Sequence, residues 1–578
     1  MAQRWGLPIV AWPSRLRPSV WDGIALPLVF GGLILLAWAS TQMSQPFHLG
    51  QQLSISLDPS YLPAYALRTV MRMALALAAS LAFSIVYAAT AAKSKRAEKL
   101  LIPILDVLQS VPILGFLSIT VTGFIWLFPG SLLGYECAAI FAIFTSQAWN
   151  MTFSLYQSFL GVPHDLREAA RMYHLSPWHS FWQLEMPFAL PQLVWNMMMS
   201  VSGGWFFVVA SEAISVNGTN VLLPGIGSYI AVAIDRRDLH AVGYAIFAML
   251  VLILIYDQLL FRPLLAWVQR FKVEAIVGEE IEAPWFLVML QRARVFRGLA
   301  RLFALMARIS SRVSQTLPAL PRATRRRRRL GRVFDIAWAV VLLAGATAAL
   351  VDIAHFVRAE VGWAEVGHVF VLGAITLLRV IVLIALAALV WVPIGVWIGL
   401  RPRLARRIQP VIQFLAAFPA NLFFPIVVSL IVVYRLTPEI WLSPLMILGT
   451  QWYILFNVIA GTLALPTDYL LVASNLGVRR WLWWRRLILP GIFPAFVTGA
   501  VTASGGSWNA SIVSEIARWG GTTLRATGIG AYIATETEAG DFPRIALGIT
   551  VLCIYVLVFN RLVWRRLYHL AEERLRLD

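Results

Sequence analysis

Long apolar segments separated by short polar ones run through almost the whole chain. A helix needs about 20 mostly apolar residues to cross the hydrocarbon core of a bilayer. Twelve segments meet this requirement, near 23–41, 66–92, 101–128, 132–160, 186–215, 241–261, 333–352, 374–400, 410–434, 440–463, 490–516 and 544–563. The pattern predicts an all-α polytopic membrane protein with about 12 transmembrane helices.

The basic residues gather in every second connection between these spans. Clusters occur at 93–99 and 401–407, in the segments 161–185 and 465–489, and in the linker 262–332. Because cytoplasmic loops carry an excess of Lys and Arg, these connections are expected to be cytoplasmic, and so are the N- and C-termini. No cleavable signal peptide is evident before the first span.

The composition agrees with a membrane protein, since 59% of the 578 residues are hydrophobic and 13% are charged. The net charge of +19 is concentrated in 262–332, which holds 16 Arg or Lys and four Glu, so the chain as a whole is not expected to bind nucleic acid. Within this linker, 284–313 predicts a basic amphipathic helix lying on the membrane lipids. The alternative is a solvated linker that only fixes topology.

The chain repeats itself at two fixed offsets. At an offset of 307, Arg72 matches Arg379 and Pro112 matches Pro419; at 303, Glu212 matches Glu515, and "GIGSYIA" (225–231) matches "GIGAYIA" (528–534). Such coincidences indicate a duplication with repeats of about 195 residues. Six spans in each repeat give both halves the same orientation, related by a pseudo-two-fold axis along the membrane normal.

The repeats set the expected domain boundaries. These are an N-terminal segment with the first span and an outer loop (1–65), permease half 1 (66–262), the basic linker (263–332), the seventh span with an outer loop (333–372), permease half 2 (373–565) and a cytoplasmic tail (566–578). Six-plus-six parallel repeats fit either a secondary transporter of the major facilitator type or a fused pair of ATP-binding-cassette (ABC) permease halves. The long loop between the fourth and fifth spans of each half favours the second class.

This loop, 161–191, resembles the characteristic cytoplasmic loop of ABC importer permeases. The family pattern is Glu-Ala-Ala, three residues, Gly, and a downstream Pro, and the first loop supplies Glu168, Ala169, Ala170 and Pro187 with His174 at the glycine position. The second loop keeps Gly477 and Pro490, while Leu471, Val472 and Ala473 replace Glu-Ala-Ala. Over both repeats the chain is similar to the nitrate/sulfonate/taurine group of permeases, in a duplicated and fused form.

The resemblance implies the type I fold of ABC importer permeases in a bacterial inner membrane, and it implies partners. Two nucleotide-binding ATPase subunits, which carry ATP and Mg, would dock under 163–176 and 466–480. A periplasmic or tethered binding protein would engage loops near 216–240 and 519–543. Because both permease halves are fused in one chain, the chain is expected to need no second copy of itself. The substrate implied is a small anion or organic anion.

Two echoing polar stretches in the fifth spans predict a translocation path. Polar side chains in a membrane helix are tolerated where they face the bundle interior, a partner or a water-filled cavity. The residues concerned are Ser202, Gly203, Gly204, Trp205, Glu212, Thr502, Ser504, Ser507, Trp508, Asn509 and Glu515. The alternative is close packing of small residues without contact to a solute.

Arg72 and Arg379 lie within spans, on the same outer side as Glu212 and Glu515. An unpaired charge there would cost about 2.5–3.5 kcal/mol on insertion scales, which favours Arg–Glu pairing between spans. The sharper hypothesis is an entrance that attracts anions, because guanidinium groups match the oxygens of sulfonate, nitrate or carboxylate.

The sequence shows no catalytic, metal or ATP site of its own. It contains no G-x-x-x-x-G-K-[ST] segment, so the energy for transport is expected to come from a separate subunit. His164, His174 and His179 lack the spacing of zinc ligands. We therefore expect a permease subunit rather than an enzyme.

Overall fold

The computed structural model describes residues 20–271, with gaps at 42, 44, 48–53, 111 and 217–218, then 284–293, six single positions between 344 and 355, and 361–574. Most of the expected span at 333–352 and most of the basic linker lie outside the described residues. The amphipathic helix expected over 284–313 is described only at its start, as α12 (Trp285–Arg292).

The first half is helical apart from one small hairpin. Its elements are α1 (Val20–Thr41), η2 (Pro59–Tyr61), α2 (Leu62–Lys93), α3 (Lys95–Ser110), α4 (Ile113–Leu127), α5 (Leu133–Leu160), α6 (His164–Met172), α7 (Pro177–Ser180), η3 (Phe181–Glu185), α8 (Met186–Glu212), β1 (Ala213–Val216), β2 (Thr219–Leu222), α9 (Ile226–Asp235), α10 (Leu239–Tyr256), η4 (Asp257–Phe261), α11 (Arg262–Val268) and η5 (Gln269–Phe271).

The second half repeats this order. Its elements are α15 (Trp363–Gly399), α16 (Pro402–Ala417), η7 (Ala420–Phe423), α17 (Phe424–Val433), α18 (Pro438–Trp441), α19 (Leu445–Leu448), α20 (Gln451–Leu463), α21 (Thr467–Asn475), α22 (Arg480–Trp483), η8 (Trp484–Ile488), α23 (Leu489–Ser514), β3 (Ile516–Trp519), β4 (Thr522–Arg525), α24 (Ile529–Ala539), α25 (Phe542–Phe559), η9 (Asn560–Trp564) and α26 (Arg565–Arg574).

The duplication read from the sequence is also visible in the backbone. The π-helical segments η3 and η8 are offset by 303 residues, and so are η4 and η9. The hairpins β1–β2 and β3–β4 share the same offset, with antiparallel pairing in matching register. Since such irregular features recur at matching positions, the two halves share their local backbone as well as their order of helices.

Six helices in the described part of the chain are long and apolar enough to cross a membrane, or up to eight if each of two bent helix pairs counts as one span. This confirms the polytopic helical class, whereas the total of about 12 spans stays a prediction. The spans predicted to reach 215 and 516 end as helices at Glu212 and Ser514, and each is followed by a β-hairpin.

Prolines break the third span of each half. The span predicted at 101–128 is divided into α3 and α4, with the extended residue Pro112 preceding α4. In the second half the helices on either side of Pro419 are bent by 76°. Proline has no N–H to donate and disfavours helical conformation in the residue before it, so each of these predicted spans is a pair of helices.

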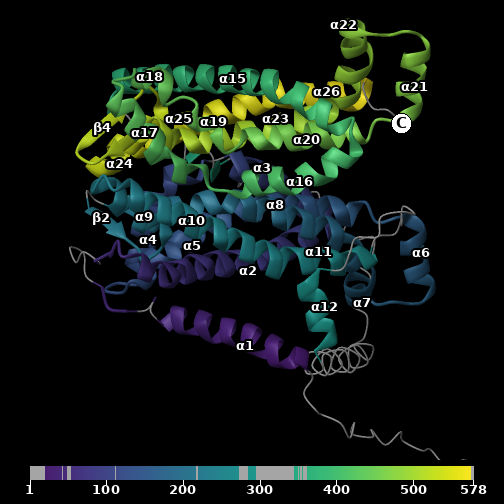
Figure 1. The fold of residues 1–578 in the computed structure, drawn as a ribbon, viewed down its shortest axis with the longest axis horizontal. Coiled ribbons are helices and arrows are strands. Elements are labelled where there is room, and N and C mark those ends of the chain that lie inside the picture. The colour runs from purple at the N-terminus through teal and green to yellow at the C-terminus, as the bar shows by residue number, and fades with distance from the viewer. Residues whose placement is uncertain are drawn as a thin grey trace, which may run out of the picture. The chain divides into compact units, whose positions relative to one another are not determined.

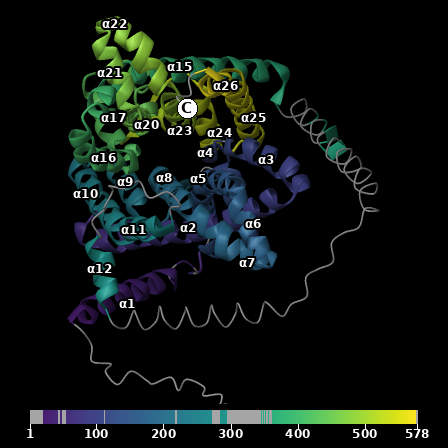
Figure 2. The ribbon, with the colours of Figure 1, turned by 90° about the vertical axis from the view of Figure 1, so that its right-hand side faces the viewer.

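The described residues group into two compact units. One holds α1, the segment 163–191 and the elements from η4 to α12, and the other holds the remaining helices of both halves. Within the second unit, α15, α20, α23 and α25 lie side by side in both views (Figure 1, Figure 2).

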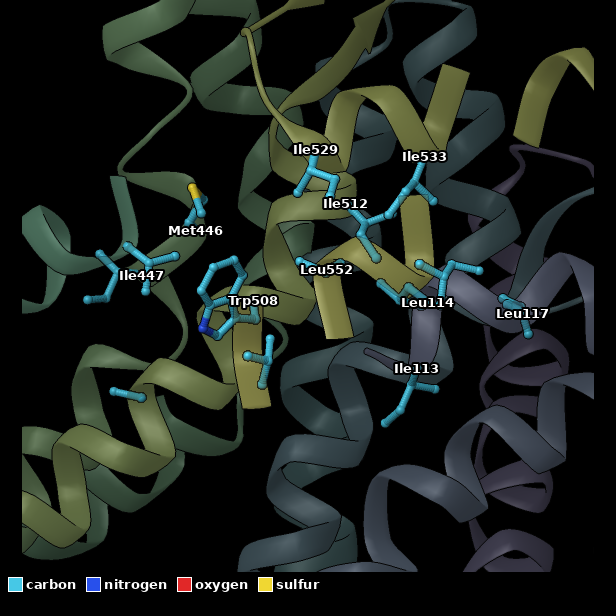
Figure 3. Packing of buried hydrophobic residues seen from close by; sticks show 14 of the residues in the cluster. Ile113, Leu114, Leu117, Met446, Ile447, Trp508, Ile512, Ile529, Ile533 and Leu552 are labelled. Atoms are coloured by element: carbon cyan, nitrogen blue, oxygen red, sulfur yellow. The ribbon is translucent and has the colours of Figure 1, made fainter. Parts of the chain in front are cut away.

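The largest apolar core lies inside the second unit and joins the two halves. Ile113, Leu114 and Leu117 from α4 belong to the same cluster as Ile512 from α23 and Leu552 from α25 (Figure 3). Because lipid tails are as apolar as Leu or Ile, it is the close packing of these side chains from both repeats, rather than their removal from water, that stabilises the association of the halves.

Candidate functional site

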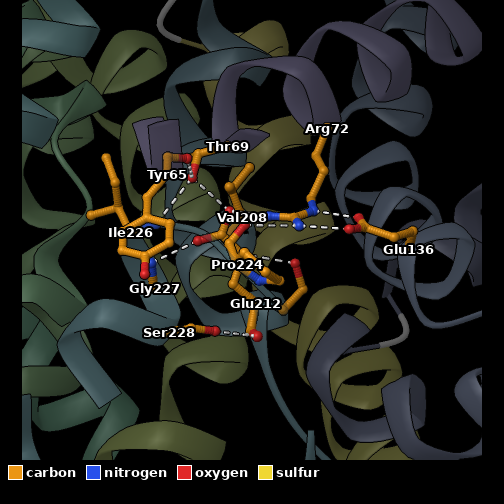
Figure 4. A network of polar contacts seen from close by, with 11 residues as sticks. Tyr65, Thr69, Arg72, Glu136, Val208, Glu212, Pro224, Ile226, Gly227 and Ser228 are labelled. Carbon is orange, nitrogen blue, oxygen red and sulfur yellow. Dashed lines mark hydrogen bonds and ion pairs between the residues drawn. The ribbon is translucent and has the colours of Figure 1, made fainter. Parts of the chain in front are cut away.

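Arg72, in the first third of α2, is at the centre of a buried ionic network (Figure 4). Its Nε lies 2.5 Å from Glu136 Oε2 and its Nη2 lies 2.7 Å from Glu136 Oε1, so the guanidinium binds this carboxylate with two parallel hydrogen bonds. Nη1 donates to Glu212 Oε1 at 2.7 Å, and Nη2 also donates to the carbonyl of Pro224 at 3.1 Å. The Arg72 side chain is 1% exposed.

Glu212 ties this network to the start of α9. Its carboxylate accepts hydrogen bonds from Thr69 Oγ1 at 2.7 Å and from the backbone N–H of Gly227 at 2.6 Å. A Cβ at Gly225 would lie 2.3 Å from the Glu212 carboxylate, and one at Gly227 would lie 2.2 Å from the carbonyl oxygen of Val209. The two glycines of the "GIG" motif are therefore required by close approach of the chain. We call Arg72, Glu136, Glu212 and Thr69 the first clasp.

A second clasp repeats this arrangement in the second half. Arg379 Nη1 donates to Glu515 Oε1 at 2.7 Å, and Thr376 Oγ1 donates to the same oxygen at 2.8 Å. The backbone N–H of Gly530 donates to Glu515 Oε2 at 2.8 Å. The second acid is Glu439 of α18, 3.0 Å from Arg379 Nη2. We call Arg379, Glu439, Glu515 and Thr376 the second clasp.

The clasps define the role that the structure gives the two arginines. Four of the five N–H donations available to the Arg72 guanidinium are used by protein oxygens, and both of its acidic partners are fully buried. Such a group has little left to offer a solute. The hypothesis of an anion-attracting entrance therefore has no support at Arg72, where the guanidinium joins α2, α5 and α8 instead.

The loops 161–185 and 465–489 contain helices that end in the same way. At the end of α6, the N–H of Leu175 donates to Ala170 O and that of His174 to Arg171 O; at the end of α21, the N–H of Val478 donates to Ala473 O. This is the Schellman arrangement, which places one residue in the left-handed conformation. His174 has φ 51° and Gly477 has φ 66°. His174 thus occupies the backbone position that favours glycine.

The first loop presents charged side chains. Glu168 is exposed on α6, with an Oε1 3.3 Å from His164 Nδ1, and Ala169 is half-buried beside it. Ala170 is buried and anchors the helix, and Pro187 lies in the first turn of α8. The exposed position of Glu168 is compatible with the partner contact that the sequence predicts.

The second loop has an apolar side chain at the position of Glu168. Leu471 there is 61% exposed, while Ala473 is buried as Ala170 is. Leu476 is 74% exposed, like its equivalent Tyr173 at 81%, and Pro490 lies in the first turn of α23. The two loops therefore share one backbone design and differ in polarity where Leu471 replaces Glu168.

The residues predicted to line the path are mostly placed in the protein interior. Those that are buried are Ser202, Gly204, Trp205, Glu212, Ser504, Ser507, Trp508 and Glu515. Glu212 and Glu515 belong to the clasps, and Trp508 belongs to the core cluster. Gly203 and Asn509 are half-buried, and Thr502 is exposed. Of the predicted set, Thr502 is thus the one residue that is exposed.

Sequence reasoning missed several residues that complete these sites. Glu136 is a single acid in the apolar run 133–160, and this isolation is the signal that could have paired it with a buried arginine. Thr69 and Thr376 occur three residues before each arginine, in the repeated "T-x-x-R" pattern. Glu439 has no counterpart in the repeat and could not be found from the offset, since the position equivalent to Glu136 is Ser443.

Comparison with protein families finds one match, and it occurs twice. The profile of the binding-protein-dependent transport system inner membrane component matches residues 80–262 and again residues 391–576, together more than half of the chain. Both matched stretches contain the loop between the fourth and fifth spans, the fifth span itself and both clasp glutamates of their half.

Several curated proteins are similar to this chain. The nitrate import permease protein NrtB of Leptolyngbya laminosa is 27% identical over 190 residues, covering 33% of this chain and 64% of that protein. The bicarbonate transport system permease protein CmpB of Synechococcus elongatus is 27% identical over 179 residues (31% and 61%). The taurine transport system permease protein TauC of Escherichia coli is 26% identical over 177 residues (30% and 62%).

The chain spans 61 to 64% of the length of these three relatives. All three are named as permeases, and none of these findings supports the major-facilitator alternative.

Proposed function

Because the chain belongs to the family of binding-protein-dependent transport system inner membrane components, we propose that it is the permease of an ATP-driven importer for a small anion. The observation that carries this proposal is the pair of exposed helices α6 and α21, which share one C-terminal geometry 303 residues apart. Each would dock one nucleotide-binding ATPase subunit, and ATP and Mg would be bound there.

The remaining parts of the proposal follow the names of the relatives and the topology expected from the sequence. Relatives named for nitrate, bicarbonate and taurine make a small anion or organic anion the substrate class. A periplasmic or tethered binding protein would deliver it to the face that carries the two hairpins. The chain would lie in the bacterial inner membrane with both termini in the cytoplasm.

The decisive experiment is affinity purification of the tagged chain in mild detergent, followed by mass spectrometry. The native chain is expected to retain a nucleotide-binding subunit, and Glu168→Arg to retain at least several-fold less. Asp235→Arg, a charge reversal of an exposed acid at the end of α9, is the matched control and is expected to retain it fully.

One outcome would reject the importer assignment, and another would reject only the role of Glu168 in the contact. If the native chain is folded and abundant but retains no ATPase, the importer assignment is wrong. If Glu168→Arg and Asp235→Arg behave alike while the ATPase is retained, the importer assignment stands and Glu168 is removed from the contact.

A further inference from the structure

Exposed positions on the membrane helices of this protein are mostly apolar, as a surface in contact with lipid requires. On α15 the exposed residues include Leu378, Val382 and Leu389, and on α10 they include Phe247 and Ile255. Hydrocarbon offers no hydrogen-bond partners, so polar atoms on such a surface are costly. A helix whose exposed positions are polar therefore faces something other than lipid.

α23 is such a helix. Between Pro490 and Ser514, all of which are described, the exposed residues are Thr498, Thr502 and Gly505. Their spacing of four and three residues places them on one helical face, and half-buried Asn509 continues it four residues further on. We call these four residues the polar face of α23.

The polar face borders open space in this structure. A Cβ at Gly505 would meet nothing within 4 Å, although one at the adjacent Gly506 would lie 2.3 Å from Thr450 Cγ2. The hydroxyls of Thr498 and Thr502 donate to carbonyls four residues earlier, at 3.1 and 2.9 Å. The Thr498 oxygen also lies 3.3 Å from Tyr568 Oη, whereas the lone pairs of the Thr502 oxygen remain available to water or to a donor on a solute.

The equivalent face of α8 is different. At an offset of 303 it carries Trp195, Met199, Ser202 and Phe206, none of which is exposed. Trp195 stacks on Phe456 of α20 with ring centroids 6.0 Å apart, and the carbonyl of Phe206 accepts a hydrogen bond from Asn421 Nδ2 at 3.2 Å. This face is therefore used for contact between the halves.

One contact is common to both sides. The backbone N–H of Ile113, at the break before α4, donates to Asn509 Oδ1 at 2.7 Å. Asn509 is equivalent to Phe206, and Ile113 is one residue from the equivalent of Asn421. Each fifth span is thus attached to the broken third span of the other half. Away from this contact, the face of α8 is covered and the face of α23 is exposed.

We propose that the translocation path is lined asymmetrically, by the polar face of α23 (Thr498, Thr502, Gly505 and Asn509), while the equivalent face of α8 only seals the contact between the halves. The proposal deepens the proposed function and rests on it. The polar face carries no charged side chain, and the guanidinium groups of Arg72 and Arg379 are bound in the clasps. Its wall thus suits a small hydrophilic solute that is passed along rather than held by an ion pair.

Cysteine accessibility tests this lining without needing ATP, partners or a known substrate. In a background carrying Cys137→Ala and Cys553→Ala, single cysteines are placed at Thr502, at Gly505 and at Met199, the equivalent of Thr502. Leu378→Cys and Gly243→Cys, on exposed apolar faces of α15 and α10, are the lipid-facing controls. The reagent is a charged, water-soluble methanethiosulfonate, applied to inverted and right-side-out membrane vesicles, because thiols ionise and react in water but not in lipid.

The cysteines at Thr502 and Gly505 are expected to react at least tenfold faster than those at Met199, Leu378 and Gly243. Equal rates at Thr502 and Met199 would overturn the asymmetry, and a rate at Thr502 as low as that at Leu378 would overturn the lining itself. Thr498→Cys provides a second reporter if either variant fails to fold, as judged by gel filtration.

The outcome is separable from that of the proposed function. Fast labelling of the cysteine at Thr502 in a chain that retains no ATPase subunit would support an aqueous path and reject the importer assignment. Slow labelling in a chain that does retain the ATPase would reject the asymmetric lining alone.

Discussion

The first clasp and the second clasp perform the same task with different degrees of closure. In the first, Arg72 is 1% exposed and its two acids, Glu136 and Glu212, are fully buried. In the second, Arg379 is 11% exposed and Glu439 is 45% exposed, although Glu515 is as buried as Glu212. After duplication, the Arg–Glu pair that joins the second span to the fifth kept its place in both halves, and the second acid did not.

The origin of that second acid explains the difference. Glu136 comes from a long helix, α5, that packs along α2, whereas Glu439 comes from the four-residue helix α18. Glu439 also accepts hydrogen bonds from the backbone N–H and the hydroxyl of Thr527, at 2.8 and 2.6 Å. The second clasp thus holds the loop between β4 and α24, whereas the first joins the helices α2, α5 and α8.

Removing the arginines should separate the two clasps most clearly. Arg72→Leu leaves two buried carboxylates without their cation, which costs about 3–5 kcal/mol of unfolding free energy. Arg379→Leu should cost about 1–3 kcal/mol, because it leaves one buried carboxylate, Glu515, without its cation, while Glu439 is 45% exposed and keeps Thr527. The thermal unfolding midpoints of the purified variants in detergent measure this difference, and equal shifts would show that burial does not distinguish the clasps.

The glycines beside the clasps should instead respond alike in both halves. A Cβ at Gly227 would lie 2.2 Å from Val209 O and one at Gly530 would lie 2.4 Å from Ser511 O, so each Gly→Ala change pushes two backbone segments apart. We expect a loss of about 1–3 kcal/mol for each. The same thermal measurement applies. Gly243→Ala, where a Cβ meets nothing within 4 Å, is the control and should not lower the midpoint.

The left-handed residues of the two loops should respond in opposite directions. Gly477→Ala places a Cβ at φ 66° and should destabilise α21 by about 1 kcal/mol, whereas His174→Gly relieves the same strain and should stabilise the end of α6. The rate of proteolytic cleavage within 163–176 and 466–480 reports both changes. A faster cleavage of the first loop in His174→Gly would contradict the expectation, and would show that the imidazole contributes more than the strain removes.

The smallest effect is expected at the start of the second span. The Ser60 backbone N–H donates to Asp58 at 2.9 Å, which lowers the pKa of this exposed carboxyl below its usual value near 3.8. The stabilisation is therefore complete above pH 3.8 and is lost as the pH falls through the lowered pKa. Amide hydrogen exchange at 60–62, measured as a ratio to Asp58→Asn, should rise only at low pH. A ratio independent of pH would exclude the cap. The equivalent residue in the second half, Glu365, lies inside α15 and therefore does not cap a helix.

Much of this architecture could be predicted from the sequence because it depends on local pattern. The apolar runs predict membrane helices wherever they occur, and the two offsets predict that the halves share features such as Glu212 and Glu515. The Glu-Ala-Ala loop and its glycine position are local as well, and the structure then places His174 in the same left-handed conformation as the aligned Gly477.

What the sequence could not determine depends on contacts between distant segments. Glu136 lies 64 residues from Arg72 and Glu439 lies 60 residues from Arg379, and only packing brings each pair together. Similarly, Trp195 and Thr498 have equivalent positions in the repeat, but Trp195 is half-buried against Phe456 and Thr498 is exposed. The sequence by itself determined the membrane helices, the duplication and the two Glu-Ala-Ala-type loops, since each depends on neighbouring residues. Tertiary structure alone decided which acid closes each clasp and which fifth span keeps a polar face open, because both depend on the neighbours that folding supplies.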